Sequence, residues 1–72
     1  MASDICELLG QRIRDLRKAK GWRQVDLAAH SGIHEVHISD LERGAAEAGL
    51  RTLHAISRAL GIRLDSMFLD ID

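Results

Sequence analysis

A stretch near the middle of the chain, Gln24 to Arg43 (QVDLAAHSGIHEVHISDLER), decides how the protein folds. Its apolar residues recur at helical spacing, and the pattern is interrupted at Gly32. Glycine tolerates the positive φ that a tight turn between two helices requires. Ala28 offers the small side chain that two closely crossing helices need, while Ile38 and Leu41 form the apolar side of the second segment. The stretch predicts two short helices joined by a tight turn.

The spacing of these small, glycine, β-branched and leucine positions is typical of a DNA-binding helix-turn-helix. Matching blocks run from about Leu9 to Phe68, in the order IRDLRKAKGW, QVDLA, GI, HISDLERG, LRTLHAISRALGI and LDSMF. On these blocks the chain resembles the Cro and phage-repressor type of helix-turn-helix, the XRE family. The resemblance implies a compact, all-α, lambda-repressor-like domain of five helices that binds double-stranded DNA, with residues 24–43 as the motif.

Apolar periodicity and end signals extend the helical pattern to the rest of the chain. One apolar stripe consists of Ile5, Leu9, Ile13 and Leu16, and a later one of Leu50, Leu53, Ile56 and Leu60. We expect five helices, over about 4–20, 24–30, 35–43, 50–60 and 64–69. The residues that precede the second, third and fifth helices are poor N-caps, namely Arg23, His34 and Arg63. We therefore expect marginal stability unless a partner chain contributes.

The composition indicates one small globular domain over residues 1–72. The chain has 72 residues, of which 46% are hydrophobic, and this length leaves no room for a catalytic domain beside the motif. The single cysteine, Cys6, rules out an intrachain disulfide and suits the reducing cytoplasm, where we expect the protein to act. There is no apolar run of membrane-spanning length and no signal-peptide pattern. Trp22 is expected to anchor the core, with a partner-facing role as the alternative.

Catalytic and metal chemistry find little support in the residue pattern. There is no nucleophile–base–orienter set and no phosphate-binding loop, so we expect neither enzyme activity nor a cofactor. His30, His34 and His37 lie close together in the sequence and, with Glu35 nearby, raise the alternative of a metal site or a pH sensor. Because the only cysteine is far away and no second ligand pair accompanies them, we expect no metal.

The net charge of -1 is unusual for a nucleic-acid-binding protein, which commonly carries a basic surface. The basic residues are nevertheless unevenly distributed along the chain. The first third contains Arg12, Arg14, Arg17, Lys18, Lys20 and Arg23, whereas much of the acid lies later, at Glu47, Asp65, Asp70 and Asp72. We expect an uneven electrostatic field and a modest affinity of each monomer for DNA.

The outward face of the second motif helix is the expected DNA-reading face. At 100° per residue, Glu35, Val36, Ser39 and Asp40 share the side opposite the apolar residues. The resemblance implies that these four residues contact base edges in the major groove. Carboxylates can accept hydrogen bonds from base amino groups, and valine can pack on a thymine methyl. Because two carboxylates must approach a phosphate-lined groove, the alternative is a solvated acidic helix that does not enter DNA.

Other positions would hold the DNA backbone rather than read sequence. The resemblance implies that Gln24, at the start of the first motif helix, clamps a phosphate together with the N–H groups of that helix end. Arg23 and Arg43 are further candidates for phosphate contacts. His37 flanks the reading face and is expected to contact a phosphate or a base.

The resemblance also implies a structural ion pair. Arg17 lies four residues before the glycine that ends the first helix, and Glu42 directly follows the last apolar position of the second motif helix. Members of the family pair the charges at these two positions. We expect a partly buried pair that fixes the first helix against the reading helix, so that loss of one partner leaves the other buried and unpaired.

The end of the chain carries more apolar residues than a short final helix needs, namely Met67, Phe68, Leu69 and Ile71. Two copies related by a two-fold axis read half-sites about one helical turn apart, whereas one copy makes few contacts. We expect a homodimer through residues 64–72; the alternative is that Phe68 closes the monomer core.

The predicted function is sequence-specific regulation of transcription from a palindromic operator, including that of its own gene. The alternative is a protein-interaction module, such as an antitoxin that binds a toxin.

Overall fold

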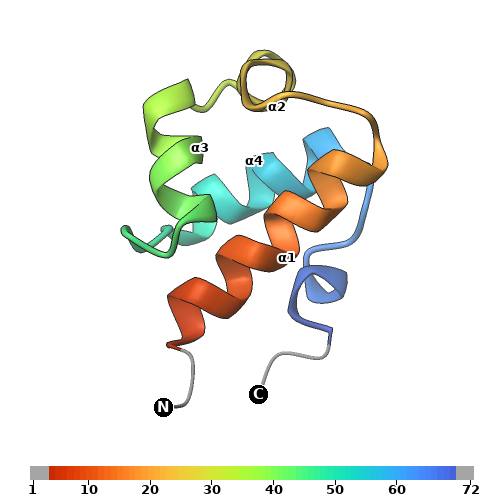
Figure 1. The fold of residues 1–72 in the computed structure, drawn as a ribbon. Helices are drawn as coiled ribbons and strands as arrows, with labels where there is room; N and C mark the ends of the chain where they lie inside the picture. Colours follow the sequence, from red (N-terminus) through yellow and green to blue (C-terminus); the bar gives the residue numbers. More distant parts are fainter. Residues whose placement is uncertain (1–3, 70–72) are drawn as a thin grey trace.

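The computed structural model describes residues 4–69, and every regular element within that range is helical (Figure 1). The elements are α1 (Ile5–Ala19), α2 (Gln24–Ser31), α3 (Glu35–Glu42), α4 (Leu50–Leu60) and the 3₁₀ helix η1 (Asp65–Phe68). The predicted all-α class is confirmed, but the expected fifth α-helix is a single 3₁₀ segment. Its hydrogen bonds run from Ser66 N–H to the Arg63 carbonyl and from Met67 N–H to the Leu64 carbonyl, the spacing of a 3₁₀ turn. None of the described helices is long and apolar enough to cross a membrane.

The helix ends in the motif are better satisfied than the sequence suggested. The Nδ1 atom of His34 accepts a hydrogen bond from Val36 N–H at 3.1 Å, so this residue caps α3 and the expectation of a poor cap there was wrong. At the start of α2, the carboxylate of Asp26 accepts the Arg23 N–H at 2.8 Å. Gly32 ends α2 with a φ of 75°, as the expected tight turn requires.

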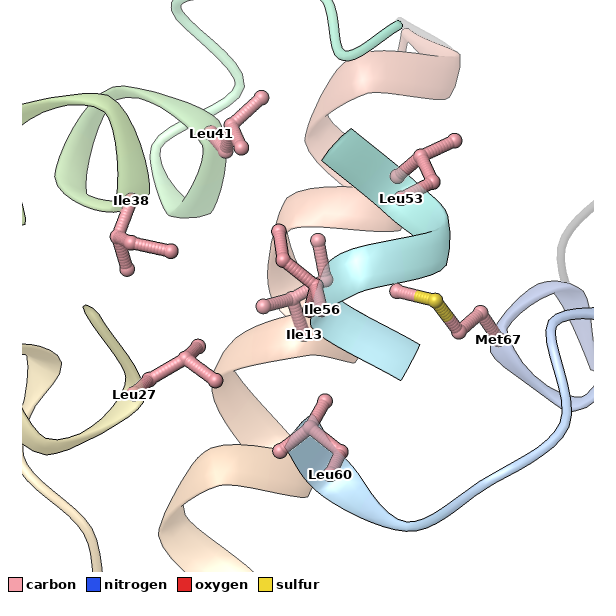
Figure 2. Close-up of a cluster of buried hydrophobic side chains, with 8 residues drawn as sticks. All are labelled: Ile13, Leu27, Ile38, Leu41, Leu53, Ile56, Leu60 and Met67. Carbon is pink, nitrogen blue, oxygen red and sulfur yellow. The ribbon is translucent and has the colours of Figure 1, made fainter. Parts of the chain in front are cut away.

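The core is aliphatic and lies between all five elements (Figure 2). Ile13 of α1 and Ile56 of α4 are both completely buried members of this core and lie near its middle in the view of Figure 2. The other buried members are Leu27, Ile38, Leu41, Leu53, Leu60 and Met67. Two residues of the predicted apolar stripes lie outside this core, since Ile5 is 52% exposed and Leu50 is 72% exposed. Both stand in the first turn of their helices, where the rest of the described fold covers them only in part.

The final segment corrects one part of the predicted dimer surface. The side chain of Met67 is completely buried and reaches the core from the side opposite Leu27 and Leu41 (Figure 2). It therefore cannot face a second copy, and it is Met67 rather than Phe68 that closes the core of the chain. Phe68 and Leu69 are exposed. Ile71 lies outside the described residues.

Gly10 allows α1 to cross the end of α3 at close range. A Cβ atom at this position would collide with the Leu41 carbonyl oxygen and would stand 2.8 Å from the Glu42 carbonyl oxygen. Both obstacles are backbone atoms, which cannot rotate away. From the sequence, a small side chain at a helix crossing was expected at Ala28. The close approach of α1 to α3 at Gly10 was not predicted.

Overpacking that separates α1 from α3 costs up to about 3 kcal/mol, and the better helix propensity of alanine returns only about 1 kcal/mol. We therefore expect Gly10→Ala to lower the free energy of unfolding by up to about 2 kcal/mol. Gly49→Ala, at the N-cap of α4, is a control for the added methyl group alone, since a Cβ there meets nothing within 4 Å. Urea denaturation followed by circular dichroism measures both variants. A Gly10→Ala variant as stable as the parent would contradict the steric account.

Candidate nucleic-acid interface

Helix α3 has a buried inner side and an accessible outer side. Its inner residues enter the core, whereas Glu35 and Val36 in its first turn are exposed. Ser39 and Asp40, one turn further on, are half-buried. The four residues predicted to read bases therefore all keep accessible surface along one short helix. His37, beside them, is also half-buried.

A buried ion pair fixes the end of α3 to α1. The Nε atom of Arg17 donates to Glu42 Oε2 at 2.7 Å, and a second guanidinium nitrogen donates to Glu42 Oε1 at 2.9 Å. Only 9% of the Arg17 side chain and 2% of the Glu42 side chain are exposed. The hydrogen bonds to Glu42 raise the pKa of Arg17 against the opposing effect of burial. The fork geometry of these bonds restricts how the two helices can be placed relative to each other.

The same pair extends to the start of α2. The side-chain amide of Gln24 donates to Glu42 Oε1 at 3.2 Å, and the remaining Arg17 nitrogen donates to the Trp22 carbonyl at 2.7 Å. Gln24, the predicted phosphate clamp, is thus held from behind by the residue that anchors α3. This contact between Gln24 and Glu42 could not be predicted from local sequence patterns, because 18 residues separate the two positions.

Trp22 lies at the edge of this network. It is half-buried and packs against the core, and its ring stacks on His30 with centroids 4.3 Å apart. The ammonium of Lys20 lies 5.1 Å from the ring centroid, within the range of a cation–π interaction. Trp22 therefore packs against core residues on one side and holds polar partners on its outer side.

Both arginines expected to contact phosphates are paired with carboxylates in the free protein. Arg43 is hydrogen-bonded to Asp40, and Arg23 lies 3.3 Å from a carboxylate oxygen of Asp26. Hydrogen bonds from the backbone and side chain of Arg23 lower the pKa of Asp26. The three-residue spacing of each pair is visible in the sequence, but spacing alone does not show whether the two side chains meet.

Comparison with known proteins bears on what this arrangement is for. A family model described as Helix-turn-helix matches residues 13–67. The chain belongs to the helix-turn-helix family. The control protein C.BamHI of Bacillus amyloliquefaciens is 38% identical over 64 residues, which are 88% of this chain and 79% of that protein. The immunity repressor of Bacillus phage phi105 is 36% identical over 59 residues, but these are only 41% of its length.

Solved structures of this helix-turn-helix family agree with the fold. The restriction-modification controller protein C.AhdI from Aeromonas hydrophila superposes with a TM-score of 0.86 at 35% identity, covering 88% of this chain and 96% of that one. The controller protein C.Esp1396I, solved as a tetramer with its 35 base-pair operator, has a TM-score of 0.84 at 27% identity, covering 93% and 88%. The predicted Cro and phage-repressor resemblance is therefore confirmed. These relatives do not support the antitoxin alternative.

We expect Glu42→Gln to lower the free energy of unfolding of this helix-turn-helix chain by about 3 kcal/mol, because it leaves the Arg17 guanidinium buried beside a neutral amide. The double variant Arg17→Met with Glu42→Leu removes both charges and should recover most of that loss. Urea titration of the three proteins measures the effect. If the single variant is as stable as the parent, the pair does not hold α3 in place.

Proposed function

We propose that the chain regulates transcription by binding an operator with two-fold symmetry as a homodimer, with α3 in the major groove. One observation carries the proposal. The C-terminal end of α3 is fixed by a buried ion pair, while Glu35, Val36, Ser39 and Asp40 remain accessible on its outer side. A rigid helix with an accessible polar and apolar edge is what direct reading of base pairs requires.

Phosphate contacts would set the position of the reading helix. In this proposal, Gln24 and the first N–H groups of α2 contact one phosphate, because a helix N-terminus favours an anion. Arg23, His37 and Arg43 contact the neighbouring backbone. The hydrogen bond from Gln24 to Glu42 supports this arrangement, since it ties the phosphate clamp to the end of the reading helix.

The relatives favour a controller-type regulator among the possible roles. The similarity to C.BamHI and to C.AhdI covers most of each of those chains, whereas the phage repressor continues well beyond the matched part. C.Esp1396I forms a tetramer on its natural operator. By analogy, we propose that this chain binds near its own promoter, alone or with a second dimer. We also propose that it has no catalytic activity.

The proposed dimer uses the segment after α4. Phe68, the last residue of η1, and Leu69, directly after it, are large apolar side chains left exposed, and Ile71 follows them in the sequence. Burying such residues between two copies would be favourable at roughly 1.5–3 kcal/mol for each fully buried side chain. A symmetric dimer would bring each exposed residue on one copy against the corresponding surface of the other.

We expect Phe68→Asp to convert the dimer into a monomer at micromolar concentration, because the carboxylate would have to be buried between the copies. Val25→Asp is the matched control, since Val25 on α2 has the same exposed fraction of 41%. Sedimentation equilibrium reports the mass of each protein. A Phe68→Asp variant that remains dimeric would exclude this segment as the interface.

The proposal predicts tight binding to a specific duplex. Fluorescence anisotropy would compare a labelled fragment from upstream of the gene with a random duplex, at low and at physiological salt. We expect at least about a thousandfold preference for the specific fragment, the lower end of the range for specific binders. Equal and salt-sensitive binding to both would place the operator elsewhere. Absence of binding to either duplex at low salt would contradict the proposed function.

A further inference from the structure

Among the exposed ion pairs of the described residues, the one between Asp40 and Arg43 stands on the reading face itself. One partner is a residue expected to read bases, and the other is a residue expected to contact phosphate. Their side chains are 36% and 64% exposed, so both are accessible to a DNA ligand. Arg43 also donates through Nε to the Ser39 carbonyl at 3.4 Å, which keeps its guanidinium along the helix. In the free protein, each charge therefore already has its partner.

We propose that Asp40 determines specificity by holding Arg43 away from DNA until a base amino group replaces it. This inference rests on the proposed function and adds a mechanism to the same face. On a specific site, the exocyclic amino group of cytosine or adenine donates a hydrogen bond to the Asp40 carboxylate in place of Arg43. Arg43 is then free to contact a phosphate, and both charges remain compensated.

On other sequences the exchange is unfavourable. If Arg43 turns to a phosphate where no amino group faces Asp40, the carboxylate stays unpaired in a groove lined by phosphates. If Arg43 stays with Asp40, the protein neutralises one phosphate fewer. Each phosphate left without its cation makes the dependence of log K on log salt shallower by about 0.9. The pair thus weakens binding to random DNA and spares binding to the matching site.

Two features of the chain support this inference. Arg23 is paired with Asp26 in the same way at the start of α2, so neither arginine expected on phosphates is free in the described structure. The net charge of -1 also leaves little general attraction for DNA. A regulator with this charge balance gains affinity at sites where base contacts free its own arginine side chains to bind phosphates.

The test compares Asp40→Asn with Asp15→Asn. Asp15 is an exposed carboxylate on α1 that accepts a hydrogen bond from the Gln11 side chain at 2.8 Å, so both variants raise the net charge of the chain by one. Anisotropy titration of the full chain on random duplex should show Asp40→Asn binding about tenfold tighter at low salt, with a salt slope steeper by about 0.9 for each copy bound. Asp15→Asn should stay within about twofold. The preference for a selected operator should fall about tenfold in Asp40→Asn.

The same substitution in an Arg43→Gln variant distinguishes masking of Arg43 by Asp40 from simple repulsion between Asp40 and the phosphates. In Arg43→Gln there is no guanidinium to release, so adding Asp40→Asn should give less than about a threefold gain on random duplex. An equal gain in both backgrounds would overturn the inference, because the carboxylate would then act only by repelling phosphates. No gain in Asp40→Asn alone would overturn it as well. If the parent chain binds no duplex, the proposed function itself fails. Circular dichroism of each variant verifies that it is folded.

Discussion

The ion pair between Arg17 and Glu42 is the constraint on which the rest of the structure depends. It is the point at which α1, the start of α2 and the end of α3 meet, since Gln24 and the Trp22 carbonyl share its donors and acceptors. A buried pair of this kind contributes little net stability compared with apolar residues, but it is costly to break. Its value lies in geometry, because planar, two-point hydrogen bonding restricts the relative orientation of the helices more than a single hydrogen bond would.

Much of the fold followed from periodicity and turn residues. The motif helices, the turn at Gly32 and the extent of α4 were predicted within about one residue, since each rests on local sequence signals. Leu50 shows the limit of that reasoning. It continues the apolar stripe of α4, yet periodicity reports only which side of a helix a residue occupies and not whether another element covers it.

The candidate site was predictable to a lesser degree, and the reasons are physical. Which side chains share the outer face of α3 follows from helix geometry. Their pairing in the free protein does not, because an aspartate and an arginine three residues apart can either meet or point to solvent. The cap from His34 depends on the orientation of its ring, which places Nδ1 against the Val36 N–H. The close crossing at Gly10 involves backbone atoms of Leu41 and Glu42, far away in the chain, which no local pattern encodes.

The chain has arginine–carboxylate pairs both in its interior and on its surface, and the two kinds have different consequences. The buried pair at Arg17 cannot exchange its partner without a cost of about 3–5 kcal/mol, so it serves as scaffold. The pairs at Arg23 and Arg43 are exposed, and pairs of that kind are worth roughly 0–1 kcal/mol. Partner exchange at the surface is therefore cheap enough for a DNA ligand to drive. A net charge summed over the sequence cannot distinguish these cases, since fixed and exchangeable pairs cancel in the same way.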